Sequence, residues 1–266
     1  MRTTTSADGT TIAYERAGSG PAIVFLPGAF NDAATCAPLA DLLQDRYTVI
    51  RPDRRGRGRS TDAIAAADVA SYEVQREIED LDAVIAAEGG EAAVFGFSSG
   101  AILALQAAVA GSRITKLALY EPPFSIGGLA GHAKEGLPAK LAALVVGGKL
   151  GDAVATMQIE GIGLPPQLVE QIRQSPMWPR LEAIAQTVVY DATITRAPNL
   201  PTPEMARLDV PAIVFSSSES WPGLRDAAIE LPRHLARAEY VDVPGGADHS
   251  IPAEATAKAL DDFLRG

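Results

Sequence analysis

Short apolar runs recur along the chain, and segments with helical periodicity separate them. The runs lie at residues 22–26, 47–51, 92–97, 114–120, 212–215 and 239–243. Because apolar and polar positions do not alternate within them, they predict strands buried on both faces, as in a parallel sheet covered by helices. A hairpin is predicted before them, over residues 3–16, where Asp8-Gly9 favours a tight turn.

Helical patterns fill the intervals between the predicted strands. In residues 71–88, apolar side chains recur at helical spacing and Ser71 is a candidate N-cap. Further helices are predicted at residues 34–44, 99–110, 224–236 and 252–264. This alternation of strand and helix predicts a doubly wound α/β fold with right-handed crossovers.

The alternation stops between Pro122 and Asp209. Four helical patterns and no convincing strand occur there, at residues 136–147, 150–159, 165–174 and 178–190. Because long structureless loops are rare, about eighty residues of this kind predict a helical cap inserted into the sheet domain. We therefore expect an α/β core formed by residues 1–121 and 209–266, with residues 122–208 as the cap.

The composition is that of a soluble globular chain and narrows the classes of function. Hydrophobic residues make up 47% and charged residues 21% of the 266 positions, and the net charge is −10. This acidic balance disfavours nucleic acid as a partner. The chain begins without an apolar signal region and has no apolar stretch long enough to span a bilayer, so we expect a cytoplasmic protein without membrane contact. The single cysteine, Cys36, excludes an intrachain disulfide, and a homodimer is compatible with the sequence.

The sequence Gly-Phe-Ser-Ser-Gly at residues 96–100 is the first candidate for chemistry. An apolar strand pattern enters it and a helical pattern leaves it, which is the setting of a nucleophile elbow. Ser98 is then expected at the carboxyl end of a strand, where the following helix presents free N–H groups to a developing anion. The alternative interpretation is a glycine-containing turn without a catalytic role.

A serine hydroxyl needs a base before it can act as a nucleophile, and the chain has three histidines. His249 follows the last predicted strand, so it is expected at the same edge of the sheet as Ser98. His132 falls in the predicted cap and His234 in a charged helix, and both are interpreted as surface residues.

Four motifs, in this order along the chain, resemble those of the α/β-hydrolase superfamily. They are FLPGAF at residues 25–30, DRRGRGRS at 53–60, GFSSG at 96–100 and GGADHS at 245–250. The resemblance covers nearly the whole chain and implies a mostly parallel eight-stranded sheet, with a helical cap inserted between strands 6 and 7. It identifies the fold and leaves the substrate open.

The resemblance also implies an oxyanion hole formed by two backbone N–H groups, those of Ser99 and Ala29. Many relatives have His-Gly-x in the loop after the third strand, but here Pro27 stands in the place of the histidine. This change leaves the N–H donors in place and removes a hydrogen bond that supports the loop.

The acid that should orient His249 is harder to assign. Most relatives have an aspartate after the strand that follows the cap, and this position is occupied by Ser220. Glu121 and Glu219 are the carboxylates that could replace it. We favour Glu121, because some relatives place their acid after the preceding strand and because Pro122-Pro123 would hold a charged residue at the sheet edge. A structural salt bridge is the alternative role for Glu121.

Five arginines crowd into residues 51–59. The resemblance implies that this segment is a structural loop, in which the glycines permit the turn and Asp53 and Arg55 tie the loop together. An anion-binding patch is the alternative.

These features predict a serine hydrolase that cleaves an ester, thioester or similar acyl bond of a small, largely apolar molecule. The catalytic residues would be Ser98, His249 and Glu121, with Ala29 and Ser99 as oxyanion donors, and neither a metal nor an organic cofactor is indicated. Candidate pocket residues are Phe30, Phe97, Phe124, Trp178 and Trp221. Three alternatives stay open: a cofactor-free perhydrolase, a biosynthetic cyclase or lyase with the same triad, and a ligand receptor that keeps the pocket without turnover.

Overall fold

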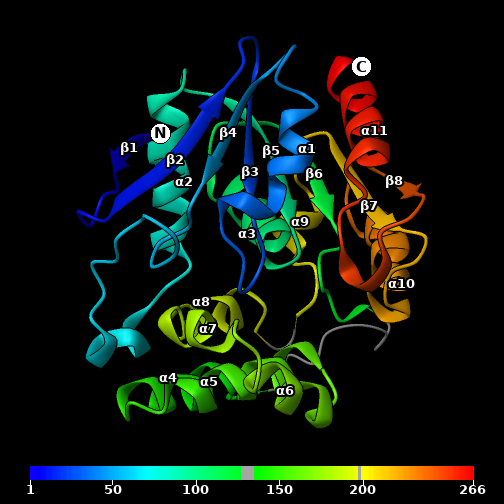
Figure 1. The fold of residues 1–266 in the computed structure, drawn as a ribbon. Coiled ribbons are helices and arrows are strands. Elements are labelled where there is room, and N and C mark those ends of the chain that lie inside the picture. Colours follow the sequence, from blue (N-terminus) through cyan, green and yellow to red (C-terminus); the bar gives the residue numbers. More distant parts are fainter. Residues whose placement is uncertain (127–134, 197–198) are drawn as a thin grey trace.

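An eight-stranded sheet forms the centre of the molecule (Figure 1). The structure is a computed structural model that describes residues 1–126, 135–196 and 199–266. The strands are β1 (Arg2–Thr5), β2 (Thr11–Ala17), β3 (Ala22–Leu26), β4 (Thr48–Pro52), β5 (Ala92–Phe97), β6 (Ile114–Tyr120), β7 (Ala212–Ser217) and β8 (Ala238–Val243). They lie in the order β1-β2-β4-β3-β5-β6-β7-β8, and only β1 and β2 pair in antiparallel fashion with their neighbours. The prediction of a mostly parallel eight-stranded sheet is confirmed.

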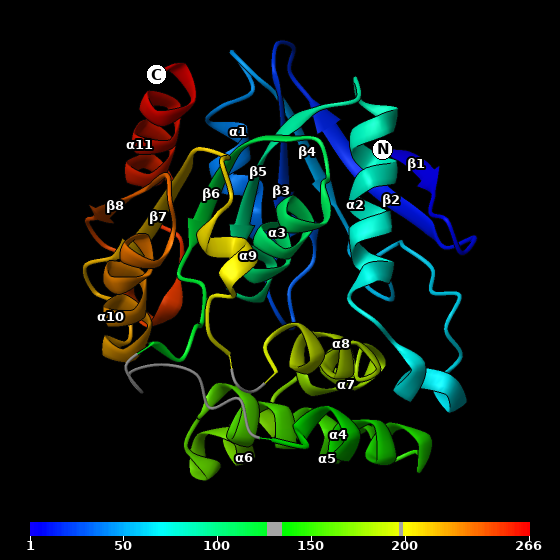
Figure 2. The same ribbon diagram turned by 180° about the vertical axis from the view of Figure 1, so that it is seen from behind.

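Helices cover both faces of the sheet, as the turned view in Figure 2 makes clear. One face carries α2 (Gln75–Ala87), α3 (Ser99–Ala110) and α10 (Pro222–Glu230), and the other carries α1 (Ala37–Asp41) and α11 (Ala253–Arg265). Successive strand residues alternate between the two apolar clusters, since Val24 and Val94 pack with α3 whereas Phe25 and Phe95 pack on the other side. This burial on both faces explains why the strands appear in the sequence as continuous apolar runs.

Two of the predicted core helices begin differently in the structure. The helix predicted from residue 71 begins only at Gln75. Ser71 is the last residue of a preceding 3-10 turn, η2 (Ala66–Ser71), and the extended backbone of Tyr72 separates this turn from α2, so Ser71 is not the N-cap of that helix. The pattern at residues 34–44 is divided into a 3-10 turn, η1 (Ala33–Cys36), and α1, whose first turn contains a proline.

Most helices of the chain between β6 and β7 form a group that lies below the sheet in the view of Figure 1. The helices between these two strands are α4 (Leu137–Val146), α5 (Leu150–Thr156), the π-helical η4 (Met157–Ile162), α6 (Pro166–Arg173), α7 (Trp178–Ala183), α8 (Thr187–Ile194) and α9 (Pro203–Ala206). No strand occurs among the described residues of this insertion. We call α4 to α8 the cap, whereas α9 packs into the apolar cluster around α3 through Met205. The domain boundaries at residues 122 and 208 stay a prediction.

Two helices of the cap differ from their predicted extent. The single helix expected at residues 178–190 is two helices, α7 and α8, with a break at residues 184–186. The helix expected at residues 150–159 changes after Thr156 into the π-helical η4. π-helical turns are rare in proteins, and those that occur are often found at functional sites. The turn η4 is therefore a first indication that this part of the cap faces a binding site.

Two expectations from composition can be compared with the structure. Cys36 is buried, and this burial raises the pKa of its thiol to about 12, so the side chain has the character of a small core residue. Within the described part of the chain, no helix has the length and apolar character that crossing a membrane requires.

Candidate active site

Ser98 lies at the turn between β5 and α3 in a backbone conformation that few side chains adopt. Its φ is 56° and its ψ is −123°. The glycines on either side make the turn possible, because neighbouring backbone fills the space that a side chain would need. A Cβ atom on Gly96 would lie 2.5 Å from Ala101 Cα, and one on Gly100 would lie 2.4 Å from the carbonyl oxygen of Leu26. The turn has the geometry expected of the nucleophile elbow.

Glu121 and His249 meet near the carboxyl ends of β6 and β8. His249 Nδ1 is hydrogen bonded to Glu121 Oε2, while Glu121 Oε1 accepts a hydrogen bond from the Ser217 N–H at 2.8 Å. The Glu121 side chain is fully buried, and that of His249 is 15% exposed. A carboxylate at Nδ1 favours the tautomer that carries its proton there, which leaves Nε2 as an acceptor.

Neighbouring side chains hold the loop that carries His249. Ser217 Oγ donates a hydrogen bond to Gly246 O at 2.6 Å, and Tyr120 Oη donates one to Ser250 O at 2.9 Å. The rings of Phe97 and Trp221 lie against the imidazole, with centroid separations of 4.7 and 5.6 Å. The imidazole is therefore positioned from several directions.

The other candidates for acid and base lie elsewhere. Glu219 is exposed, and Ser220 Oγ is buried without a hydrogen-bond partner among the described residues. His234 is exposed and lies 3.8 Å from Glu230. His132 lies outside the described residues.

Positive φ angles at non-glycine residues concentrate at this site, which no sequence pattern revealed. In the described chain they occur at φ values between 46° and 62°, at Phe30, Ser98, Glu121, Asp248 and His249. Such conformations cost on the order of 1–3 kcal/mol each and persist only where surrounding contacts enforce them. Their convergence from separate segments is an independent indication of a functional site.

A cavity of about 1430 Å³ opens beside Ser98 and His249. Its walls include most of the predicted site residues, namely Ala29, Phe30, Phe97, Ser99 and Trp221. The cap contributes further apolar wall, chiefly Met157, Ile162, Leu164, Leu168 and Leu181. Among the described lining residues there is no arginine or lysine, and Asp248 adds a negative charge.

Phe124 and Trp178 do not line this cavity, contrary to the expectation that they would. Phe124 follows β6 and is buried in the cluster around α3. Trp178 packs with Val154 and Leu181 inside the cap, and its indole N–H donates to Glu182 at 2.9 Å. Both are core residues. They were expected in the cavity because they lie near a catalytic segment or in the cap, but position in the sequence does not determine which way a side chain points.

The two predicted oxyanion donors lie on facing segments beside Ser98. Gly28 allows this approach, because a Cβ atom there would lie 2.8 Å from Ser98 Cβ. In the part of the chain that the structure describes, the N–H groups of Ala29 and Ser99 donate to no protein acceptor, and both residues line the cavity. Unpaired donors at a helix N-terminus and a neighbouring loop are what a developing oxyanion requires.

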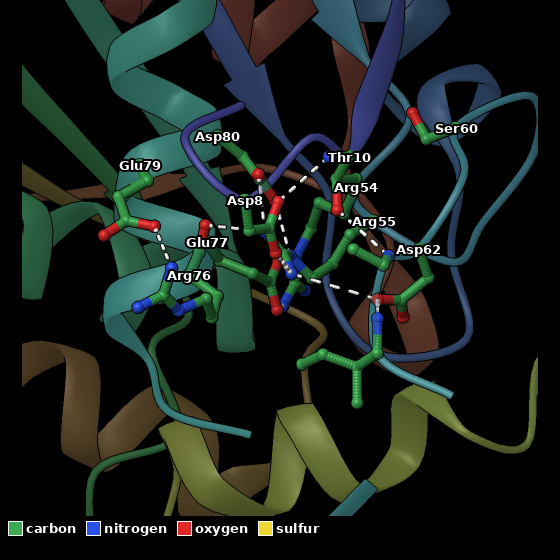
Figure 3. Close-up of polar contacts among 12 residues, drawn as sticks. Asp8, Thr10, Arg54, Arg55, Ser60, Asp62, Arg76, Glu77, Glu79 and Asp80 are labelled. Carbon is green, nitrogen blue, oxygen red and sulfur yellow. Dashed lines mark hydrogen bonds and ion pairs between the residues drawn. The ribbon is translucent and has the colours of Figure 1, made fainter. Parts of the chain in front are cut away.

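Three arginines of the arginine-rich loop are buried, namely Arg54, Arg55 and Arg57, and their guanidinium groups are paired with carboxylates. Arg55 bonds to Asp80 and Asp8 on either side, and Arg54 forms a two-bond pair with Glu77 (Figure 3). This pairing contradicts the alternative of an anion-binding patch for these arginines.

Asp53 and Arg55 stabilise the loop separately and do not pair with each other. Asp53 accepts hydrogen bonds from the N–H groups of Arg59 and Ala33, so it ties the loop to itself as expected. Arg55 instead joins the loop to α2 and to the β1–β2 turn through Asp80 and Asp8.

Arg57 and Asp191 are residues that the sequence analysis missed. Arg57 is buried and bonds both to Gly28 O and to Asp191 on α8. Asp191 is a fully buried carboxylate within an otherwise apolar stretch of the cap. The sequence did contain a signal for Asp191, namely an acidic residue within an apolar helical pattern. Because burial of an isolated carboxylate is costly, such a residue is expected to have a charged partner.

Comparison with known proteins defines the class to which this fold and site belong. Residues 23–262 match the model of the alpha/beta hydrolase family. The chain therefore belongs to the alpha/beta hydrolase family. It is similar over 99% of its length to all of an alpha/beta hydrolase from Sphaerobacter thermophilus DSM 20745, with 42% identity and a TM-score of 0.87.

Two more distant similarities agree with this class. "Uncharacterized hydrolase YraK" of Bacillus subtilis (strain 168) is 36% identical over 103 residues, which are 38% of this chain and 37% of that relative. The chain thus matches little more than a third of that relative's length. An enol-lactonase from Burkholderia xenovorans LB400 is matched over 100% of both chains with a TM-score of 0.72, but at 22% identity this likeness concerns the fold alone.

Proposed function

We propose that this chain is a serine hydrolase that cleaves an ester, thioester or similar acyl bond through a covalent acyl-enzyme. The observation that carries this proposal is the hydrogen bond between His249 Nδ1 and Glu121 Oε2, beside a cavity that Ser98 also lines. A buried carboxylate, an imidazole and a strained serine at the end of a strand are the groups that a nucleophilic triad requires.

In the proposed mechanism, His249 Nε2 takes the proton of the Ser98 hydroxyl as Ser98 Oγ attacks the acyl carbon. The N–H groups of Ala29 and Ser99 stabilise the negative charge that develops on the carbonyl oxygen. His249 then protonates the leaving alcohol or thiol and, in the second half-reaction, deprotonates the water that hydrolyses the acyl-enzyme. Glu121 maintains the required tautomer and stabilises the imidazolium.

The cavity supports a largely apolar substrate without a negative charge. Its volume of about 1430 Å³ exceeds the roughly 300–1,000 Å³ of common ligand pockets, so it has room for more than an acetyl group. Asp248 would repel a carboxylate, and no cation of the described lining residues would bind one. We therefore propose an uncharged acyl ester of intermediate chain length as the substrate class.

A series of p-nitrophenyl esters from acetate to decanoate tests this proposal. We expect kcat/KM to rise with chain length up to about octanoate, by at most about fourfold per methylene, because burial of each CH2 contributes roughly 0.8 kcal/mol. Ser98→Ala should lower kcat by at least about 10⁴-fold, whereas Ser112→Ala, just beyond the far end of α3, should leave it unchanged. Failure of the wild type on the whole series, or full activity of Ser98→Ala, would overturn the proposal.

A further inference from the structure

One carboxylate of the cap contacts the supports of both proposed oxyanion donors. Asp191 Oδ1 accepts a hydrogen bond from Ser99 Oγ at 2.8 Å, and its Oδ2 accepts one from Arg57 Nη2 at 2.5 Å. Arg57 Nη1 in turn donates to the carbonyl oxygen of Gly28 at 2.7 Å. Asp191 is thus bonded directly to one donor residue and, through Arg57, to the peptide that carries the other.

The bond to Gly28 O is significant because the Gly28 carbonyl and the Ala29 N–H belong to one planar peptide group. Fixing the direction of the carbonyl therefore fixes the direction of the N–H on its opposite side. A charged donor at the carbonyl also polarises the peptide and makes its N–H a stronger donor. Arg54 Nη1 holds the preceding carbonyl, that of Pro27, at 3.1 Å.

This network is buried and balanced in charge. The side chains of Arg54, Arg57, Glu77 and Asp191 are each at most 2% exposed, and they comprise two cations and two anions. Burial alone would raise the pKa of Asp191, but the guanidinium groups of Arg57 and Arg54, together with the Ser99 hydroxyl, lower it below its ordinary value. The carboxylate therefore remains charged at neutral pH and can bind both partners.

Attachment of the cap to the core would not by itself require contacts to the oxyanion loop. The neighbouring ion pair of Arg55 and Asp80 is similarly buried, yet among the described residues Arg55 bonds to α2, to the β1–β2 turn and to Asp62, and not to the oxyanion loop (Figure 3). Arg54 and Arg57 instead bond to successive carbonyls of the loop in which Pro27 has replaced a supporting histidine. They supply the support that this replacement removes.

We propose that Asp191 and Arg57 are positioning residues for the oxyanion hole, which is complete only when α8 of the cap is docked on the core. This inference rests on the proposed function of Ser98, Ala29 and Ser99. It adds that the cap contributes to the chemical step through Asp191 as well as to the walls of the cavity.

The first test compares Asp191→Asn with the matched control Asp80→Asn, since each variant removes one carboxylate from a buried arginine pair. We expect Asp191→Asn to lower kcat about 10- to 100-fold, with KM changed less than about threefold, because the donors remain but lose their alignment. Asp80→Asn should keep kcat within about threefold even where its loss of stability is similar. Equal losses of kcat in the two variants would overturn the proposal.

A second readout measures stabilisation of the oxyanion directly, with an alkyl trifluoromethyl ketone as the probe. Ser98 Oγ adds to its carbonyl carbon, the proton passes to His249, and the carbonyl oxygen becomes an anion in the hole. In Asp191→Asn, the inhibition constant of the ketone should rise by the factor by which kcat/KM falls. That of the corresponding secondary alcohol, which forms no oxyanion, should not change. Equal weakening of both inhibitors, or of neither, contradicts the proposal.

A third variant covers the case in which Asp191→Asn does not fold. Ser99→Ala removes only the bond between Ser99 Oγ and Asp191. The carboxylate of Asp191 keeps its bonds to Arg54 and Arg57, so no buried charge loses its ionic partner. We expect kcat to fall about threefold to tenfold with KM unchanged, the effect of one lost hydrogen bond, and an unchanged kcat would reject the positioning role. A wild type that neither hydrolyses the esters nor binds the ketone would instead reject the proposed function.

Discussion

At the scale of single residues, the site is held together by strained backbone and short polar contacts. Ser98 and His249 both have positive φ angles, which place their side chains at positions that relaxed loops would not offer. Glu121 shares this strain and is fixed by the Ser217 N–H on one oxygen and by His249 on the other. The orientation of the imidazole therefore depends on a carboxylate with almost no freedom to move.

Replacement of Glu121 tests this dependence. Glu121→Gln keeps the shape of the side chain but removes the charge that favours the imidazolium, so kcat should fall by about 10²- to 10⁴-fold with little change in KM. Steady-state kinetics on a p-nitrophenyl ester measures the effect, and Glu219→Gln is the control because Glu219 is exposed. A larger loss in Glu219→Gln than in Glu121→Gln would show that the acid has been assigned to the wrong residue.

The site residues that could be predicted from the sequence are those that lie in short, recognisable motifs. Ser98 and His249 lie in short motifs next to strand ends, so the sequence indicated both. Asp191 could not be paired with Ser99 in this way, since 92 residues separate them and only the folded cap brings them together. The same reason explains Phe124 and Trp178, because a position in the chain does not tell which side of a loop or helix faces the cavity.

At the scale of elements, the strands were predicted closely and the helices of the cap less well. The six parallel strands are mostly apolar runs bounded by proline, glycine or polar residues, and the structure places their ends within two residues of the prediction. The break between α7 and α8 contains neither glycine nor proline, so it had no local signal. Likewise, nothing in the residues of η4 distinguishes a π-helical turn from an α-helical one.

The helix α3 approaches β3 closely at Gly100, and adding one methyl group there tests this packing. A Cβ atom on Gly100 would lie 2.4 Å from Leu26 O and 2.7 Å from Pro27 O, both backbone atoms. Overpacking of this kind costs roughly 1–3 kcal/mol, so we expect Gly100→Ala to lower the melting temperature by about 2–12 °C. It should also lower kcat, because the displaced carbonyls belong to the loop that carries Ala29.

Gly111→Ala is the matched control for this prediction. Gly111 ends α3 with a φ of 94° and has open space where a Cβ would lie, so the control carries the cost of backbone strain without a clash. Calorimetry of both variants should find the larger decrease for Gly100→Ala, with kcat preserved in Gly111→Ala. A Gly100→Ala protein as stable and active as the wild type would contradict the packing described for the elbow.

At the scale of the whole molecule, buried ion pairs join parts that are distant in sequence. Arg55 connects the loop after β4 to α2 and to the β1–β2 turn, and Asp191 connects the cap to the core. Carboxylates in such pairs make stability depend on pH. Burial would raise the pKa of Asp8, but its hydrogen bond with Arg55 and its bonds with Thr10 lower it from 3.8 to about 2.

The sign of the pH effect follows from this lowered pKa. Because the folded state favours the carboxylate of Asp8, its stabilisation is present above about pH 4 and is lost as the pH falls toward 2. Urea denaturation at pH 7, 5 and 3 should therefore find a smaller loss of stability between pH 5 and 3 in Asp8→Asn than in the wild type. Asp45→Asn, at an exposed position, should behave like the wild type. If Asp8→Asn loses as much stability between pH 5 and 3 as the wild type does, this role of Asp8 is contradicted.

The most direct test of the central claim is the identity of the covalent nucleophile. Reaction with a fluorophosphonate, followed by mass spectrometry of the intact protein and its peptides, measures how many serines are activated and which ones. We predict one adduct per chain in the wild type, located on Ser98, and none in Ser98→Ala. An adduct on another residue, or labelling that persists in Ser98→Ala, would contradict the assignment of this chain as a hydrolase that acts through Ser98.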